Sequence, residues 1–408
     1  MRVEIIQDRK RLSQNELILY LSLIAIAALL VCVYYLRRGI YSPRIGYNIV
    51  DLLINYIQFG AVRRGLSGSI VYLSRIDLAH VPFVLYGVSA VSFVVASFFL
   101  LRRMTAYAIE YIPFLIFLAG LLLFWSAEMG KTDIVVAVVL IAMALALVNG
   151  RIVLASVLLV IGVLVHEVCA IYGLPLLAAL LIDDGRYKQF KWRSFAWSAA
   201  VLAAGAILYE ATMMLPRSSN SVIVATIESE LRSIQLDPSL VPQAFYFHLG
   251  GARAVKTAMC IVDGSNNRTI QLLITLTMVA VAIISLSGTR PVKWILPVFV
   301  SAPSILFLWM TGLDMSRWVA LGILNVWIFC AIRNFAPFER ESRRFVWASV
   351  FCAAAMAVIL YPKTVYVSGN YLYPSPILEK VLEMAVGRPI YKTQEECDPT
   401  WRSLLSQD

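Results

Sequence analysis

The chain has 408 residues, of which 60% are hydrophobic and 15% are charged, and its formal net charge is +10. Soluble domains are about half apolar and about a quarter charged, so this composition excludes an ordinary soluble domain and indicates a polytopic membrane protein. Lys and Arg in the loops of a membrane protein account for the positive charge, so we expect no nucleic-acid partner.

The apolar runs approach or exceed the roughly 20 residues that a helix needs to cross a bilayer core. They are rich in Leu, Val, Ile and Ala without sustained alternation, which predicts helices and not the strands of a barrel. Spans are expected at about 17–36, 81–101, 107–126, 133–149, 151–166, 168–182, 194–214, 269–287, 294–311, 318–333 and 346–362. The predicted fold class is therefore all-α, a transmembrane helical bundle of about eleven spans over residues 1–362, followed by a tail over 363–408.

The first run ends in "RR" and has no small-residue cleavage site, so we expect it to stay in the protein as a span and not to be a signal peptide. The density of Lys and Arg in the short loops predicts the orientation. It places the N-terminus in the cytoplasm and the C-terminus outside, with three long outer segments at 37–80, 215–268 and 363–408.

The first outer segment is too polar to span a membrane but carries Ile, Leu, Tyr and Val at helical spacing. Its stretch "YNIVDLLINYIQFGAV" predicts an amphipathic helix that lies at the outer interface. A second helix is expected from Leu66 to Leu73, with Gly65 and Gly68 as loose points between the two. Together these helices would roof a polar cavity that opens to the outer face.

Ionisable residues gather at the predicted outer ends of the spans and in the loops next to them. They are Arg63 and Arg64 in "AVRRG", Glu128, Lys131 and Asp133 in "AEMGKTD", His166 and Glu167 in "VHEVC", Arg253 and Lys256 in "GARAVK", and Asp314 and Arg317 in "GLDMSRW". Such groups at membrane depth usually face a bundle interior or an aqueous cavity. The guanidinium groups suit the oxygens of a lipid-linked phosphate or diphosphate, and an acidic member would orient sugar hydroxyls or act as a general base.

Each of these groups also has a purely structural interpretation. Arg63 and Arg64 fit a snorkelling anchor, Asp314 and Arg317 fit an ion pair at a helix start, Lys131 and Asp133 fit a turn pair, and His166 and Glu167 fit an interhelical pair. The stretch "HEVCA" lacks the second histidine of a zinc-binding HExxH motif, so no metal is expected. A function is favoured because all of these ionisable residues are predicted to lie on the same, outer side of the membrane.

Two of the six cysteines lie in polar segments. Cys260 and Cys397 would form a disulfide if both face an oxidising compartment, whereas the others lie in apolar runs and fit small core residues.

With these features the chain resembles the integral-membrane glycosyltransferases of the GT-C class, and within it the Wzy-like polymerases of bacterial O-antigens and exopolysaccharides. The resemblance rests on about eleven spans, on the amphipathic first outer loop and on the outward-facing "GKTD", "HE" and "GLDMSRW". It implies an enzyme of the bacterial inner membrane that takes undecaprenyl-diphosphate-linked saccharides as donors at the periplasmic face. It also implies that Arg63, Arg64, Arg253 and Arg317 bind the diphosphate. Many GT-C enzymes keep an acidic residue in the first outer loop as a base or metal ligand, and the matching candidates are Asp51 and Asp77, although neither lies in the paired-acid pattern of the metal-dependent members.

The candidate site follows from these two lines of argument. The catalytic candidates are His166, Glu167, Asp314 and Asp51, and the substrate-binding candidates are Arg63, Arg64, Arg253, Lys256, Arg317, Glu128, Lys131 and Asp133. No cofactor is expected; the expected partners are the lipid-linked oligosaccharide, the lipid bilayer, and a chain-length regulator and flippase of a polysaccharide pathway.

The alternative is a transporter or flippase for lipid-linked saccharides or small solutes, which needs access from both sides and usually has inverted repeats. The sequence contains no convincing repeat, and its polar residues crowd one leaflet. A third hypothesis is a non-catalytic scaffold of a polysaccharide machine.

Overall fold

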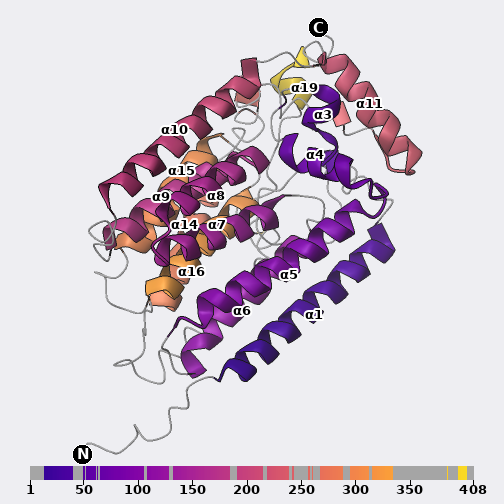
Figure 1. Cartoon of the computed structure of the whole chain (residues 1–408). Coiled ribbons are helices and arrows are strands. Elements are labelled where there is room, and N and C mark those ends of the chain that lie inside the picture. The colour runs from indigo at the N-terminus through magenta and orange to yellow at the C-terminus, as the bar shows by residue number, and fades with distance from the viewer. Residues whose placement is uncertain are drawn as a thin grey trace, which may run out of the picture.

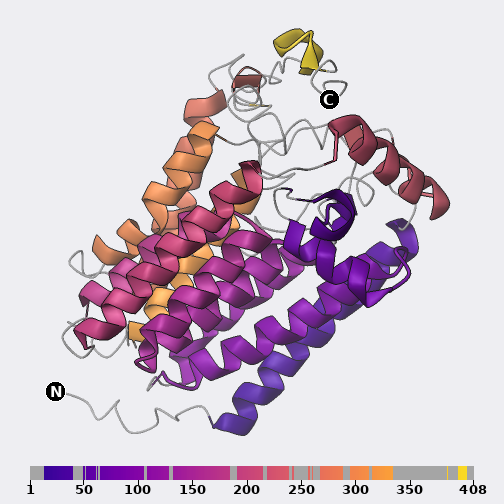
Figure 2. The same cartoon turned by 45° about the horizontal axis from the view of Figure 1, so that its top comes forward.

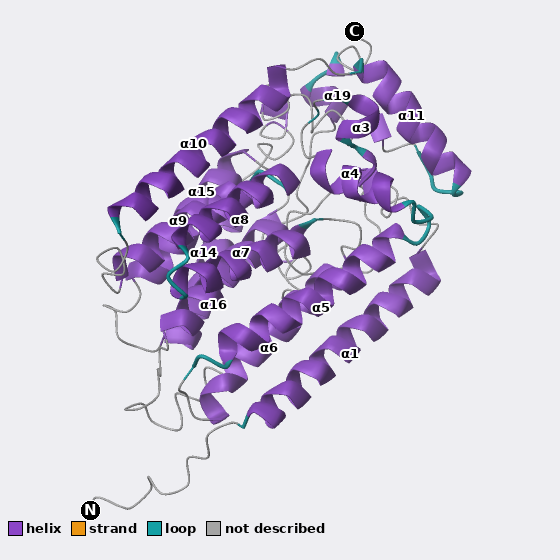
Figure 3. Ribbon diagram, in the orientation of Figure 1, coloured by secondary structure: helices purple, strands orange, loops and turns teal. Residues whose placement is uncertain are grey.

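The described part of the chain is helical. The computed structural model describes residues 13–39, 49–50, 52–60, 62, 65–104, 108–127, 132–183, 191–214, 218–238, 241–242, 256–257, 260, 267–287, 295–311, 315–333, 384 and 394–401. The helices are α1 (Gln14–Gly39), α3 (Tyr56–Phe59), α4 (Gly65–Ser74), α5 (Val81–Leu101), α6 (Ala108–Ala127), α7 (Asp133–Val148), α8 (Ile152–Val165), α9 (Val168–Asp183), α10 (Trp192–Met214), α11 (Asn220–Ser233), α14 (Asn267–Ser287), α15 (Ile295–Thr311), α16 (Met315–Arg333) and α19 (Gln394–Cys397). Over those residues no β-strand occurs (Figure 3).

The apolar runs of the sequence coincide with helices. Each predicted span from the first to 318–333 matches one helix with both ends within three residues, and the expected span 346–362 lies outside the described residues. Within the described ranges, Val81–Leu101 and Trp192–Ala211 are long and apolar enough to cross a membrane, and the other apolar helices are shorter. The all-α class is thus confirmed for this part of the chain, whereas the count of about eleven spans stays a prediction, since two of the described helices meet the length and composition of a membrane span.

The centre of the bundle is α16, which contacts α5, α6, α7, α9, α14 and α15. All its side chains from 317 to 331 are buried, as expected of a helix that is apolar on every side. Polar groups on α16 bond to its neighbours: Trp327 Nε1 donates to the Phe114 carbonyl at 3.0 Å, and Asn325 Nδ2 donates to the carbonyls of Tyr172 and Val300. These bonds fix the rotation of α16 among its neighbours, which apolar packing alone specifies poorly.

Short amphipathic elements gather at one end of the bundle. Figures 1 and 2 show α3, α4, α11 and α19 together at the end opposite to the start of α1. These helices come from the three segments predicted to lie outside. At the other end, Arg103 Nη1 donates to Asn149 Oδ1 at 2.7 Å, which joins the turn after α5 to the turn after α7. Both turns belong to the basic loops predicted to lie inside.

We call residues 49–62 with α3, α4 and α11 the roof, because they form a second hydrophobic core at that end. One face of α11 buries Ile223, Ile227 and Leu231 against Ile49 to Ile54 and against Val81 at the start of α5. The backbone N–H of Ser218 donates to the Phe59 carbonyl at 2.9 Å and ties the two outer segments together. The roof is therefore assembled from parts of the chain more than 140 residues apart.

A disulfide joins Cys260 to Cys397, with 5.7 Å between the two Cα atoms. It links the second outer segment to the C-terminal tail, which is the pairing that the sequence left open.

The first outer loop differs from its prediction in two ways. The expected single helix over 47–62 is broken at Asn55, whose side-chain oxygen accepts hydrogen bonds from the N–H groups of Ile57 and Gln58 and starts the short α3. Asn is a strong N-cap residue, so a new helix starts after Asn55 and the preceding helix does not continue through it. The chain then turns at Gly60, which has a φ of 78°.

Gly65 and Gly68 are not loose points; both lie within α4 and pack tightly. A Cβ atom on Gly68 would stand 1.8 Å from the Ile54 carbonyl oxygen, and one on Gly65 would stand 2.7 Å from the Tyr56 ring. Ser69 Oγ donates to the Gly65 carbonyl and accepts from the Tyr56 N–H, which completes this contact. The absence of side chains at the two glycines lets the 54–56 backbone rest directly on α4.

Gly68→Ala is expected to lower the free energy of unfolding of the roof by about 1–3 kcal/mol, because the new methyl group overlaps backbone atoms that must move. The matched control is Gly87→Ala in α5, where a Cβ meets nothing within 4 Å. That change should stabilise its helix by about 0.5–1 kcal/mol. Limited proteolysis of the protein in lipid nanodiscs measures both, and equal cleavage rates in the two variants would contradict the packing described.

Candidate functional site

Asp133 and Arg317 form an ion pair inside the bundle. Arg317 Nε lies 2.6 Å from Asp133 Oδ2, and Arg317 Nη2 lies 2.8 Å from Asp133 Oδ1. The Asp133 side chain is 1% exposed and the Arg317 side chain 8% exposed. This bidentate geometry is the strongest that a guanidinium and a carboxylate form. It joins the first residue of α7 to the first turn of α16, across 184 residues of sequence.

His166 and Glu167 form the junction between α8 and α9. His166 is extended, with φ −162° and ψ 126°, and interrupts the helical run between Val165 and Val168. Its Nδ1 atom accepts a hydrogen bond from the Val168 N–H at 3.2 Å and lies 3.6 Å from Glu167 Oε2. A nitrogen that accepts an N–H bond carries no proton, so this geometry favours the neutral ring with its proton on Nε2.

Trp318 lies between the Asp133–Arg317 pair and the His166–Glu167 junction. The Arg317 guanidinium carbon lies 5.2 Å from the centroid of the Trp318 ring, within cation–π range. The His166 ring lies edge-on to the Trp318 ring, with 6.5 Å between centroids. We call Asp133, His166, Glu167, Arg317 and Trp318 the polar cluster. It is formed at the ends of helices that are remote in sequence, and α8 in turn contacts α4 of the roof.

Exposure separates the members of the polar cluster. Asp133 and His166 are each 1% exposed, whereas the Glu167 side chain is 19% exposed. Glu167 is therefore the acid of the cluster that a bound molecule can reach. Asp133 instead serves to hold the Arg317 guanidinium in place.

The structure brings together four of the predicted site residues: Asp133, His166, Glu167 and Arg317. Lys256 is exposed and belongs to no group described here. The remaining candidates, Asp51, Arg63, Arg64, Glu128, Lys131, Arg253 and Asp314, lie outside the described residues. Asp77 is described: its Oδ1 accepts from the Ala79 N–H at 3.0 Å and caps the turn before α5.

No group of three or more His, Cys, Asp or Glu side chains that could hold a metal ion occurs among the described residues.

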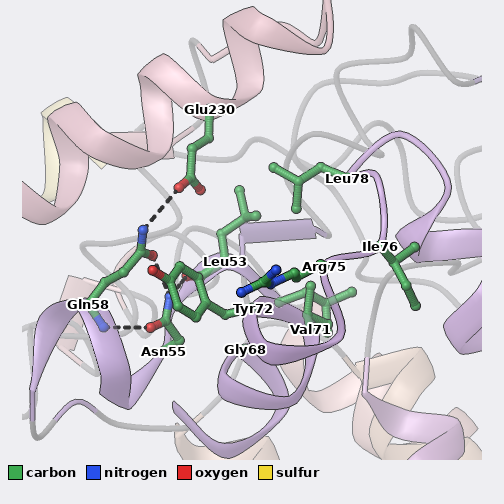
Figure 4. Close-up of a pocket in the computed structure, with 11 residues that line it drawn as sticks. Leu53, Asn55, Gln58, Gly68, Val71, Tyr72, Arg75, Ile76, Leu78 and Glu230 are labelled. Carbon is green, nitrogen blue, oxygen red and sulfur yellow. Dashed lines mark hydrogen bonds between the residues drawn. The ribbon is translucent and has the colours of Figure 1, made fainter.

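The roof contains a pocket of about 200 Å³. Polar side chains from three elements face it, as Figure 4 shows: Asn55 and Gln58 from the α3 region, Arg75 after α4, and Glu230 from α11. Its apolar wall consists of Leu52, Leu53, Val71, Tyr72, Ile76 and Leu78, with Gly68 beside them. Burial raises the pKa of the Glu230 carboxyl, and the hydrogen bond from Gln58 acts in the opposite direction. Burial likewise raises the pKa of the neighbouring Tyr56 phenol.

The sequence analysis missed this pocket because it expected no helix in 215–268. The signals were present: Ser219 is an N-cap whose Oγ accepts from the Val222 N–H, and Ile223, Ile227 and Leu231 repeat every four residues. That spacing marks one face of a helix. The sequence does not show which part of the protein this face of α11 packs against.

The chain matches no protein-family model, no curated protein and no solved structure. The resemblance to the Wzy-like glycosyltransferases therefore stays a prediction from the sequence.

Asp133→Ala and Arg317→Ala are each expected to lower the free energy of unfolding by about 3–5 kcal/mol, because each leaves a buried charge without this partner. The double change Asp133→Leu with Arg317→Met removes both charges and keeps apolar volume, so its stability should match or exceed that of the natural chain. Thermal unfolding in nanodiscs compares the three. Single variants as stable as the natural chain would show that the pair contributes nothing to folding.

Proposed function

We propose that the protein is a membrane-embedded glycosyltransferase of surface polysaccharide biosynthesis, which takes polyprenyl-diphosphate-linked saccharides as donors at the roof end of the bundle. The observation that carries the proposal is the polar cluster: a histidine, two carboxylates and a guanidinium that meet at helix ends next to the roof, all of them buried except the partly exposed Glu167. Buried ionisable groups in an apolar bundle are expensive and mark functional sites by default.

The surface of the bundle supports the membrane part of this proposal. Large apolar side chains are exposed along the outer helices: Ile18, Leu19, Leu23, Ile26 and Leu30 on α1, Val88, Val91, Val95 and Phe99 on α5, and Trp192, Trp197, Ile207 and Leu208 on α10. Trp192 is 83% exposed. Soluble monomers rarely expose apolar patches of this extent, whereas lipid tails cover them without cost.

The lengths of the helices support a cluster at membrane depth. α8 has 14 residues and α7 and α9 have 16 each. At 1.5 Å per residue they extend about 21–24 Å, less than the hydrocarbon core of about 30 Å. If these helices cross the bilayer, their roof-side ends lie below its surface, where a lipid-linked substrate enters from the side.

The disulfide supports an outward-facing roof. Cys260 and Cys397 join two of the segments predicted to lie outside, and disulfides persist in oxidising compartments such as the bacterial periplasm. We therefore place the roof end in the periplasm and the basic turns in the cytoplasm, with the eleven spans of the sequence prediction.

We infer different roles for the members of the polar cluster. An acceptor hydroxyl attacks the anomeric carbon of the donor, its proton passes to the Glu167 carboxylate, and the bond to the diphosphate oxygen breaks to release the polyprenyl diphosphate. His166 positions Glu167 through the backbone: its extended conformation interrupts the helical run and sets Glu167 at the break between α8 and α9. Arg317 already makes two hydrogen bonds to Asp133, so we assign it to holding the polar cluster in place. We assign binding of the departing diphosphate to Arg63, Arg64 and Arg253.

Glu167→Gln tests the assignment of the base. It keeps the size of the side chain and removes the proton acceptor, so polysaccharide chain growth should fall by about 100-fold or more, while the amount of protein in the membrane stays unchanged. The assay is the length distribution of surface glycan in the host bacterium after replacement of the chromosomal gene.

The matched control is Glu228→Gln on α11. Glu228 pairs with the exposed Arg232 at 3.2 Å and lies outside the polar cluster. Normal chain lengths in the control are expected. Normal chain lengths in the Glu167 variant would remove the proposal and favour a transporter or a scaffold.

Cysteine labelling tests the orientation, with Cys32, Cys169, Cys330 and Cys352 replaced by Ala. In spheroplasts, a membrane-impermeant maleimide should react with Cys260 and Cys397 only after an impermeant reductant has opened the disulfide. With Cys260→Ser, Cys397 should react without reductant. Protection of Cys397 in that variant until the cells are lysed would place the tail in the cytoplasm.

A further inference from the structure

We propose that the roof pocket is a binding subsite for a single sugar ring of the glycan. It lies between α4 and α11 and is lined by Asn55, Gln58, Tyr72, Arg75 and Glu230. The proposal rests on the proposed function for the origin of that sugar, a saccharide presented at the periplasmic face. The pocket is a different site from the polar cluster.

Hydrogen bonds of the Asn55 and Gln58 side chains hold the side of the pocket that accepts hydrogen bonds, the Glu230 carboxylate. Asn55 Nδ2 donates to Gln58 Oε1 at 2.6 Å and to the Leu53 carbonyl at 3.0 Å. Gln58 in turn directs its Nε2 at Glu230 Oε1, 3.5 Å away (Figure 4). The Asn55 oxygen is fixed by its role as N-cap of α3. The Glu230 carboxylate is thus oriented before any ligand arrives, with its second oxygen available.

The group that donates hydrogen bonds into the pocket is the Arg75 guanidinium. Among the described residues its guanidinium has no hydrogen-bond or ion-pair partner, and it does not pair with Glu230 although both line the same pocket. Arg75 has a φ of 52°, a left-handed conformation that follows the last residue of α4. Glycine or asparagine is the usual residue at such a helix end. An arginine in this disfavoured conformation, at the edge of a pocket, is consistent with a role of its side chain in binding.

The two charges together select the ligand. A phosphate would meet the Glu230 carboxylate, and an amine would meet the Arg75 guanidinium. A sugar hydroxyl both donates and accepts, so a ring bearing several hydroxyls satisfies Arg75, Gln58 and Glu230 at once. Tyr72 and the leucines of the wall offer apolar surface to the C–H face of the ring.

The size of the pocket agrees with a ligand of this kind. Its volume of about 200 Å³ lies below the roughly 300–1,000 Å³ of pockets that hold drug-sized molecules. One sugar unit fits better than an oligosaccharide, whose further units would extend into solvent through the open side of the pocket.

The experiment is saturation-transfer NMR on the full chain in nanodiscs, with glucose, rhamnose, N-acetylglucosamine and glucuronate as probes. At least one sugar should show transfer from protein to ring protons. Arg75→Asn and Glu230→Gln should each reduce the apparent affinity for that sugar by about tenfold or more, as expected when a hydrogen bond to a charged group is lost. Arg232→Asn and Glu228→Gln are the matched controls on α11, the helix that also carries Glu230; neither residue lines the pocket, and both variants should bind as the natural chain does.

The melting temperature separates lost binding from lost folding. Arg75→Asn is expected to unfold at the same temperature as the natural chain or above it, because asparagine tolerates the left-handed conformation better than arginine does. No transfer to any of the four sugars, or transfer that survives both pocket variants, would overturn the proposal. So would competition by inorganic phosphate, which would identify an anion site.

Failure of this proposal is distinguishable from failure of the proposed function. Sugar binding that depends on Arg75, together with normal chain growth in Glu167→Gln, would leave a sugar-binding protein without the proposed catalysis. Lost chain growth in Glu167→Gln, with no sugar binding at the roof, would leave the catalysis without this subsite.

Discussion

The buried pair of Asp133 and Arg317 is the main geometric constraint on the bundle, because neither charge can be buried without the other. Two charges withdrawn from water carry a desolvation cost of several kcal/mol each, and only close bidentate contact offsets it. The pair therefore holds the start of α7 against the start of α16 at a fixed height. Because α16 is the helix that most others contact, this fixes the end of the bundle at which His166 and Trp318 also meet.

The roof depends on a different kind of contact. It has an apolar core of its own, and its two halves come from segments that flank most of the bundle in sequence. Close backbone approach at Gly68 and the N-cap at Asn55 shape one half, while a single apolar face of α11 closes the other. The same Asn55 that breaks the helix also orients Gln58 toward Glu230, so the local break in structure and the geometry of the pocket have one cause. Bundle and roof thus present two polar sites at one end of the molecule, one buried among helix ends and one open to solvent.

The sequence predicted the helices well but did not predict the ion pair between Asp133 and Arg317. Hydropathy alone located the main helices of the bundle to within three residues, because an apolar run of sufficient length has few alternatives to a helix in lipid. The sequence offered neighbour pairs as structural alternatives, Asp133 with Lys131 and Arg317 with Asp314, and both of these partners lie outside the described residues. The ion pair that the structure shows joins Asp133 to Arg317 across 184 residues. Local spacing carries no information about which helix ends meet. The same limit hid the roof pocket, where Arg75 and Glu230 are brought together only by the packing of α11 on the first outer loop.

By itself the sequence determined the all-α class, the positions of the apolar helices, the concentration of ionisable groups at their ends and the two cysteines able to pair, since each of these follows from composition and period along the chain. Only the tertiary structure decided that Arg317 binds Asp133, that His166 accepts from the backbone of α9 and approaches Glu167, and that the roof encloses a pocket. The reason is that hydrophobic burial is non-directional, so local sequence is enough to predict an apolar helix. Long-range ion pairs and close backbone contacts depend instead on which distant surfaces meet.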